Sequence, residues 1–331
     1  MLRFAYIGNF GPEHSTENHV RQALVRNGHE VTTLQENTVE TWETLRGSPI
    51  DADVVLWTRT GWDWPALTGW TKEEADAHQR AALANLHDVG IPVVGYHLDR
   101  WWGLNRQGQV TEEPFFEADI VCTADGGHDA QWLDAGVNHR WFPPGVSLAE
   151  CERAFAGRDR RWANLDVAFV GSWMSYHEEW LDYRRSLVSA LSRRYRRRFS
   201  PLPLRGGLRG EALTQLYGTV PVIVGDSCLS GDITSYCSDR LPETIGRGGF
   251  LVHPDVEGIT DGTVFRSGEH LATYPLGDFN AMVEIIDRYL GDEPARKAMV
   301  DVGRSHVMAH HTYEARMTEL VDLLNDEGWL K

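Results

Sequence analysis

Short runs of β-branched and aromatic residues alternate with longer helical segments along this 331-residue chain, and no other feature restricts its fold as strongly. In the first half, strands are predicted at residues 2–8, 31–34, 53–57 and 91–96, with helices at 17–27 and 72–89. In the second half, strands are predicted at 167–170, 220–224 and 250–252, and closing helices near 279–290, 294–308 and 312–328. Strand–helix alternation builds parallel sheets that are covered by helices. The sequence therefore predicts an α/β protein with a doubly wound sheet in each half.

The stretch that separates the two halves has no apolar periodicity. Between residues 147 and 165 it includes a charged run at 158–161, which is typical of a linker rather than of a core element. We therefore place an N-terminal domain at 1–150, a linker at 151–165 and a C-terminal domain at 166–311. The chain is long enough for two domains with a core each.

The charge of the chain bears on its partners. With 48 acidic against 32 basic residues, the net charge of −16 disfavours a protein whose main task is to bind a phosphate backbone. One basic cluster, at 193–198, lies at the predicted end of a helix that begins near Glu178. Cations there would complement the helix C-terminus and stay solvated. The alternative is a patch that binds an anionic acceptor.

Neither the start of the chain nor its cysteines indicate export. The chain begins with a strand at 2–8 rather than a signal peptide, and no apolar run is long enough to span a membrane. Cys122, Cys151, Cys228 and Cys237 include no close-spaced pair. Free thiols in a reducing compartment are the simplest interpretation. We therefore expect a cytoplasmic protein.

The segment 238–252 carries the strongest chemical signal. Asp239 is predicted to cap a short helix that has Pro242 in its first turn, and glycines and a buried strand follow. This order places Glu243 near the carboxyl edge of a parallel sheet, where α/β folds bind ligands. A carboxylate there can accept hydrogen bonds from both hydroxyls of a ribose. The alternative is that Glu243 only complements the helix dipole.

Four pieces of the chain, taken in order, resemble one family. They are residues 118–125 with the turn 142–146, the strand and glycine turn 167–172, the segment around Glu243, and the tail 265–316. This series resembles the donor half of group-1-type glycosyltransferases of the GT-B fold, in particular the subgroup of CgeB-like proteins of bacteria and phages. The resemblance spans roughly residues 85 to 325.

The resemblance implies a fold and a reaction. It implies two Rossmann-like domains that face a cleft, with the final helix, 312–331, packing back on the N-terminal domain. The activity would be the transfer of a hexosyl or pentosyl group from a nucleotide sugar to a hydroxyl of a protein, a polysaccharide or a small molecule. A UDP-sugar is favoured as the donor, with a GDP-sugar as the alternative, and no tightly bound cofactor is expected.

In the donor half, the resemblance places Glu243 on the ribose and Arg240 on a phosphate or a structural partner. Gly171 and Ser172 form a turn before a predicted helix, and its N–H groups and hydroxyl suit a diphosphate. Capping of that helix alone is the alternative.

Two features of the family are missing from this sequence. Ser235 stands eight residues before Glu243, where retaining members have a second glutamate, and no Arg–Lys pair follows the glycine turn. Arg184, Arg205 or Arg209 could replace that pair as the clamp on the diphosphate. The stereochemistry of the transfer therefore stays open.

In the first half, two turns at the carboxyl ends of strands carry candidate catalytic residues. His14 lies in a loop, 8–19, that lacks the spacing of a dinucleotide fingerprint. It is a candidate base because histidine titrates near neutrality, and a surface or capping role is the alternative. His97 and Asp99 resemble the His-Asp position of retaining members. If the strand's alternation continued through them, both would share one face.

Gly11, Trp101 and Asp125 complete the candidates on the acceptor side. The indole of Trp101 would offer a flat face to a sugar, and the alternative is that it fills the core. Three other functions stay open. They are a DNA glycosyltransferase that acts on a hydroxylated base, a sugar-nucleotide epimerase, and a non-catalytic protein that binds a nucleotide sugar.

Two patterns that suggest metals are set aside. Asp51-Ala52-Asp53 has the form D-x-D but precedes a strand at its amino end, so we expect it to cap that strand. His306, His310 and His311 are close in sequence without an H-E-x-x-H pattern or a nearby acid. We therefore predict no metal held by the protein itself, although a divalent ion could accompany a nucleotide.

Overall fold

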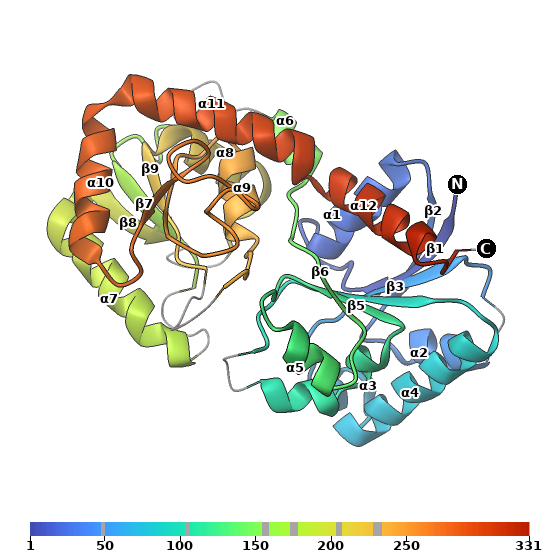
Figure 1. Cartoon of the computed structure of the whole chain (residues 1–331). Coiled ribbons are helices and arrows are strands. Elements are labelled where there is room, and N and C mark those ends of the chain that lie inside the picture. Colours follow the sequence, from blue (N-terminus) through green and yellow to red (C-terminus); the bar gives the residue numbers. More distant parts are fainter. Residues whose placement is uncertain are drawn as a thin grey trace. The chain divides into compact units, whose positions relative to one another are not determined.

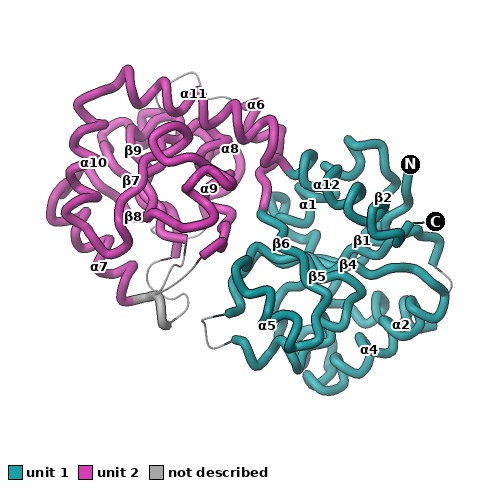
Figure 2. Tube along the Cα trace, in the orientation of Figure 1, with its two compact units in different colours: residues 1–143, 313–331 teal, residues 144–312 magenta. Residues whose placement is uncertain are grey.

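The computed structural model describes residues 1–47, 50–102, 106–153, 159–172, 178–202, 207–227 and 234–330, and at 178–181 it describes the backbone alone. The chain forms two compact units (Figure 2). Unit 1 contains Met1–Pro143 and Tyr313–Lys331, and unit 2 contains Pro144–Thr312. Each unit has its own sheet.

Unit 1 is built on a six-stranded sheet in the order β2-β1-β3-β4-β5-β6, in which all neighbouring strands are parallel (Figure 1). Its elements are β1 (Arg3–Gly8), α1 (Thr16–Arg26), β2 (Glu30–Gln35), α2 (Val39–Gly47), β3 (Val54–Thr58), α3 (Trp64–Thr68), α4 (Lys72–Asp88), β4 (Val93–His97), η1 (Gln107–Thr111), η2 (Pro114–Glu117), β5 (Ile120–Thr123), α5 (Asp129–Asp134), β6 (His139–Trp141) and α12 (Tyr313–Asp326). Every residue of β3 and β4 is buried, as expected for central parallel strands that are covered on both faces.

Helices cover both faces of this sheet. On one face, α1 and α12 pack against alternate residues of β1 such as Phe4 and Tyr6. On the other face, α2, α4 and α5 pack with an aromatic cluster that includes Trp57. The helix α12 lies beside α1, and Asn27 Nδ2 donates to the carbonyl oxygen of Glu314 at 2.8 Å. The last helix therefore completes the core of unit 1, although the whole of unit 2 precedes it in sequence.

Unit 2 is built on a five-stranded parallel sheet in the order β11-β10-β9-β7-β8. Its elements are α6 (Leu148–Glu152), β7 (Val167–Val170), α7 (Glu178–Tyr195), η3 (Arg196–Arg198), β8 (Phe199–Leu202), α8 (Gly210–Thr219), β9 (Val222–Val224), α9 (Arg240–Gly246), β10 (Leu251–Pro254), β11 (Ala272–Tyr274), α10 (Phe279–Gly291) and α11 (Glu293–His310). The helices α7 and α10 pack on one face, through residues such as Leu187 and Ile286, and α8 packs on the other through Leu213 and Leu216.

The chain passes from unit 1 to unit 2 at Pro143–Pro144, whereas the sequence places a linker at 151–165. Residues 148–152 form α6, and Cys151 there is buried. Arg304 Nη2 donates to the carbonyl oxygen of Cys151 at 2.6 Å. These partners are distant in sequence, so no local pattern shows that α6 belongs to unit 2. Residues 154–158 of the predicted linker lie outside the described residues.

The strand order reverses once in each sheet, and this reversal positions the candidate sites. In unit 1 it falls between β1 and β3, and in unit 2 between β7 and β9. Open α/β sheets bind ligands outside the carboxyl ends of the strands at such switch points. The residues that follow β7 and β9, and those that follow β1 and β3, are therefore the first places to look for chemistry.

None of the described helices combines the length and the apolar character that crossing a bilayer requires. Cys122, Cys151 and Cys237 are buried, and within the described part of the chain they form no disulfide with one another, while Cys228 lies outside the described residues.

Candidate functional site

A buried ion pair shapes the switch point of unit 2. Asp226 follows β9, and both of its carboxylate oxygens accept hydrogen bonds from Arg184 of α7, at 2.5 and 2.9 Å. The same guanidinium donates through Nη1 to the carbonyl oxygen of Ser172, at 2.7 Å. Arg184 therefore fixes the turn after β7 and binds a carboxylate of its own unit. This geometry gives it a structural task instead of the diphosphate clamp that the sequence left open for it.

The structure brings Arg240 to the glycine turn after β7. A Cβ atom at Gly171 would lie 3.4 Å from Nη2 of Arg240, and one at Gly225 would lie 3.0 Å from Cγ of the same side chain. Because these two glycines have no Cβ atom, the Arg240 side chain can pack against them. A guanidinium beside the exposed Ser172 is suited to bind an anion. Of the other candidate clamps, Arg205 lies outside the described residues.

Glu243 lies one turn further along α9. Its side chain is 16% exposed, and Oε1 lies 3.6 Å from Nη2 of Arg247. Arg247 is itself buried. Its Nη1 donates to Glu150 Oε2 at 2.9 Å and to Thr214 Oγ1 at 2.8 Å, so these bonds fix the guanidinium. The Glu243 carboxylate is therefore held from one side by a fixed cation and keeps part of its surface accessible.

The start of α9 is held by serines rather than by a cap from Asp239. The sequence predicts Asp239 as the N-cap, and it does occupy that position, but its side chain makes no capping hydrogen bond because its backbone is already helical (φ −54°, ψ −24°). Instead, Ser227 Oγ lies 2.6 Å from Ser238 Oγ and 2.5 Å from His253 Nε2. Ser227 has a left-handed backbone (φ 52°), which is uncommon outside glycine and indicates local strain.

His253 completes this contact from β10. Burial lowers the pKa of His253 to about 4, so the ring is neutral at neutral pH. The ring thus links β10, the loop after β9 and the start of α9 without adding a charge.

In unit 1, His97 and Asp99 come together through a turn. The strand β4 ends at His97, so the alternation that would put both side chains on one face does not continue. Instead, the backbone N–H of Asp99 donates to His97 Nδ1 at 3.0 Å, and Asp99 Oδ2 lies 3.1 Å from Arg106 Nη1. Since Nδ1 accepts, the proton of the neutral ring belongs on Nε2. Burial lowers the pKa of His97 to about 4, so at neutral pH it is a neutral hydrogen-bond donor.

Asp125 and Trp101 organise the loop that follows His97. Asp125 Oδ2 accepts hydrogen bonds from the backbone N–H groups of Trp101 and Trp102, both at 2.8 Å. Trp101 is 2% exposed, and its ring packs edge-on against His97 and Phe116. The indole therefore fills the core, and the sugar-facing role that the sequence offered for it does not fit this burial. Asp125 is placed to position the loop.

His14 and Gly11 lie in the loop between β1 and α1. Ser15 caps α1, its Oγ accepting from the N–H of Asn18 at 3.2 Å, so His14 has no capping task. The ring of His14 is half-buried, with its centroid 6.3 Å from that of His19. Gly11 is exposed and donates its N–H to Asn9 Oδ1 at 3.3 Å.

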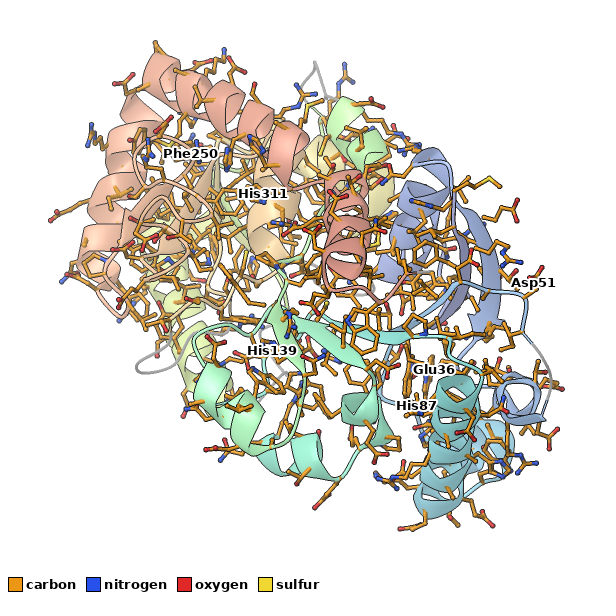
Figure 3. The ribbon with its side chains drawn as sticks, turned by 45° about the vertical axis from the view of Figure 1, so that its right-hand side comes forward. Glu36, Asp51, His87, His139, Phe250 and His311 are labelled. Atoms are coloured by element: carbon orange, nitrogen blue, oxygen red, sulfur yellow. The ribbon has the colours of Figure 1, made fainter. Side chains whose placement is uncertain are left out.

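Two buried carboxyl groups that sequence analysis missed lie at the switch point of unit 1. Glu36 follows β2 and accepts from Trp57 Nε1 at 2.9 Å, from the N–H of Thr60 at 2.9 Å, and from Trp62 Nε1 (Figure 3). Glu17, in the first turn of α1, lies 3.5 Å from Thr60 Oγ1. Burial raises the pKa of both carboxyls, that of Glu36 to about 7. A polar residue directly after a strand, the signal that singled out His97, would have found Glu36.

This burial predicts a pH dependence of stability. A carboxyl whose folded pKa is raised stabilises the fold fully below its unfolded pKa of about 4.5, and the contribution is lost as the pH rises through about 7. We expect wild type to lose about 2.5 kcal/mol of unfolding free energy relative to Glu36→Gln between pH 5 and 8. Urea unfolding at several pH values measures this difference. The constant offset that the amide introduces does not affect the slope, and a difference that is flat with pH would contradict the prediction.

The two patterns that suggested metals in the sequence make hydrogen bonds within the protein. Asp53 Oδ2 accepts from the backbone N–H of Arg3 at 2.8 Å, which is a cap at the amino end of the strands. His306 Nε2 lies 2.8 Å from the carbonyl oxygen of Val264 and 3.0 Å from His311 Nε2, and burial lowers the pKa of His306. These histidines therefore pack together, with His306 in contact with His311. The absence of a metal stays a prediction.

The basic cluster at the end of α7 is partly neutralised within unit 2. Arg194 pairs with Asp287 at 2.5 Å, and Arg198 pairs with Asp166. Both arginines are more than half exposed, in keeping with the solvated cations that the sequence predicts. These two aspartates therefore offset part of the positive charge of the cluster.

Comparison with known families and structures adds to this geometry. A family model described as "Glycosyl transferase-like" matches residues 153–322, just over half of the chain. The match contains Gly171, Arg184, Asp226, Arg240 and Glu243. No curated protein matches the sequence.

Solved structures with low sequence identity share the fold. HepE from Anabaena, solved in complex with UDP and glucose, is 10% identical, with a TM-score of 0.63 over 98% of this chain and 100% of that one. An α-glucosyltransferase, solved with UDP-glucose and DNA containing an abasic site, is 12% identical, with a TM-score of 0.68 over 98% and 99%. Sucrose-phosphate synthase from Thermosynechococcus elongatus is 15% identical, with a TM-score of 0.59 over 98% and 99%. The two-domain GT-B fold predicted from the sequence is thereby confirmed.

Proposed function

The chain belongs to the glycosyl transferase-like family, and from this premise we propose that it transfers a sugar from a UDP-sugar to an acceptor hydroxyl. The observation that carries the proposal is the approach of Arg240 to Gly171, with Glu243 one turn behind it, at the switch point of unit 2. The resemblance of this segment also supports a place in the CgeB-like subgroup.

The ribose and the diphosphate of a nucleotide each have a partner in this arrangement. The accessible edge of Glu243 accepts hydrogen bonds from the two ribose hydroxyls. Arg240 and the backbone around Gly171 and Ser172 bind the diphosphate, which suits a cation and N–H groups. The choice of UDP is supported by HepE and by the α-glucosyltransferase, which were solved with UDP or UDP-glucose. A GDP-sugar is the alternative donor, and the thermal-shift experiment below distinguishes it from a UDP-sugar.

Unit 1 supplies the acceptor side in this proposal. In the transfer, a bond forms between the acceptor oxygen and the anomeric carbon, and the bond from that carbon to the diphosphate oxygen breaks, so that UDP leaves. The proton of the hydroxyl goes to a base, for which His14 is the candidate. His97, neutral and protonated on Nε2, donates a hydrogen bond to a sugar hydroxyl. Asp99 and Asp125 position the turn that carries it.

A thermal-shift panel tests the donor. A nucleotide that binds only the folded state at 100 times its dissociation constant adds about 2.7 kcal/mol of stability, which raises the Tm by roughly 5–10 °C for a unit of this size. We expect UDP and at least one UDP-sugar to produce this shift, and GDP and GDP-sugars to produce none. The absence of a shift with every nucleotide would contradict the proposed donor site.

Assays without an acceptor distinguish a transferase from an epimerase and from a binding protein, and an assay with a DNA acceptor tests the third alternative. A sugar-nucleotide epimerase would convert its substrate without any acceptor, and a binding protein would show a shift without turnover. DNA with hydroxymethylated bases tests the remaining alternative, which the α-glucosyltransferase solved with DNA supports. The net charge of −16 and the pairing of Arg194 and Arg198 with aspartates favour a protein, polysaccharide or small-molecule acceptor instead.

A further inference from the structure

Unit 2 has a cavity at the edge of its sheet opposite the proposed donor site. It has a volume of about 550 Å³ and is lined by residues that precede β9 and β10, such as Pro221 and Phe250, and by residues of α11. Since these residues precede their strands, the cavity lies at the amino edge of the sheet. The labelled Phe250 lies near α10 and α11 (Figure 3). A cavity of this size is in the range that holds a small organic molecule.

The lining is positively charged, although the protein as a whole is acidic. Four cations line the cavity, against two acids. Lys297 pairs with Glu293 at 2.6 Å, and both are exposed. Arg296 donates to the carbonyl oxygen of Tyr289 at 2.5 Å and Arg304 to that of Cys151 at 2.6 Å, so these bonds orient the guanidinium groups without neutralising them. Among the described residues, neither arginine forms an ion pair.

Arg247 gives a second, independent sign of a ligand. It lines the cavity and is 3% exposed, and within the described part of the chain its buried Nε has no hydrogen-bond partner. An unpaired N–H on a buried guanidinium is costly. Because this atom is itself inaccessible, an anionic oxygen in the cavity would satisfy it after the guanidinium shifts toward the ligand. The apolar wall formed by Phe250, Val220 and Val300 suits the ring or carbon face of the same ligand.

We propose that this cavity binds a small phosphorylated molecule with a sugar or other ring, and that its occupancy changes the affinity of the donor site. The phosphate lies on Arg296 and Arg304, and the Arg247 guanidinium shifts toward it. Arg247 carries the coupling, because its Nη2 also lies 3.6 Å from Glu243 Oε1. A ligand that shifts the guanidinium therefore changes how Glu243 is held. The coupling rests on the proposed function of Glu243, whereas the binding of the phosphate does not.

Calorimetric titration of the full chain tests the binding. Inorganic phosphate and ribose 5-phosphate are the probes, and ribose is the neutral control. We expect one saturable site per chain for ribose 5-phosphate, about 10-fold or more weaker in Arg304→Gln and unchanged in Arg288→Gln, which removes an exposed arginine of α10 outside the cavity. Saturable binding that is equal in wild type and in both variants would overturn the site, as would no binding at millimolar concentration.

A second titration tests the coupling. We expect the dissociation constant of UDP to change at least threefold when ribose 5-phosphate is saturating, and this change to disappear in Arg304→Gln. Simple competition between the two ligands would mean that ribose 5-phosphate occupies the donor site, and a UDP affinity that is constant would exclude the coupling. Failure of the proposed function looks different, because UDP alone would then not bind, while the phosphate titration still decides whether the cavity is a site.

Discussion

Replacing Glu243 with glutamine is expected to lower kcat/KM for the UDP-sugar by about 100-fold. A carboxylate that accepts two ribose hydroxyls makes two charge-assisted hydrogen bonds, each worth about 1.5–3 kcal/mol. Glutamine keeps one acceptor oxygen without the charge, so a loss of about 3 kcal/mol in transition-state binding is expected, and each 1.4 kcal/mol is tenfold. Steady-state kinetics with purified enzyme, together with UDP titration by thermal shift, measures the effect.

The interpretation depends on the variant staying folded, and the structure gives a reason to expect this. Arg247 keeps its hydrogen bonds to Glu150 and Thr214 when Glu243 is changed, so the buried cation is not left unpaired. Glu211→Gln, at an exposed position of α8, is the matched control and should keep full activity. If Glu243→Gln bound UDP as tightly as wild type, the ribose would not lie on this carboxylate, and the dipole interpretation would remain.

The architecture could be predicted from the sequence because its signals are local and repeated. The segments 167–170 and 54–57 are continuous apolar runs, and helices such as α4 are followed by a glycine, Gly90 in that case, so their type follows from short windows. The resemblance around Glu243 added the expectation that both halves are Rossmann-like domains. The transition at Pro143–Pro144 was not visible, because α6 belongs to unit 2 through distant partners such as Arg304.

For the site, the sequence could indicate single candidate residues but not how they are buried or paired. Position after a strand selected Gly171 and His97 as candidates, and the motif selected Arg240 with Glu243, whose roles stay predictions. Burial and pairing depend on the tertiary structure, which is why Trp101 was considered for a sugar. The pairing of Arg184 with Asp226 was missed for the same reason, since those two residues lie on α7 and after β9, 42 positions apart. Glu36 was missed although its place after a strand would have selected it, and only its burial depends on the tertiary structure.

Breaking the Arg184–Asp226 pair is expected to have the largest effect on stability. Both side chains are less than a tenth exposed, and the contact is bidentate. Removing one partner of a buried pair leaves an uncompensated charge and costs about 3–5 kcal/mol. For a unit of this size, Arg184→Met should lower the Tm of unit 2 by roughly 6–20 °C. Thermal unfolding followed by circular dichroism measures the shift.

Two further variants separate the buried charge from the loss of packing. The pair Arg185–Asp182 lies on the same helix, at 3.7 Å, with side chains 56% and 95% exposed, so Arg185→Met should cost less than about 1 kcal/mol. The double variant Arg184→Met/Asp226→Leu removes both charges and should recover much of the lost Tm, because apolar replacements of a buried pair are often neutral. UDP binding should stay weak in that double variant even when the Tm recovers, because the carbonyl of Ser172 has lost the donor that fixes the turn. Equal Tm losses in the single and double variants would show that packing, and not the buried charge, sets the cost.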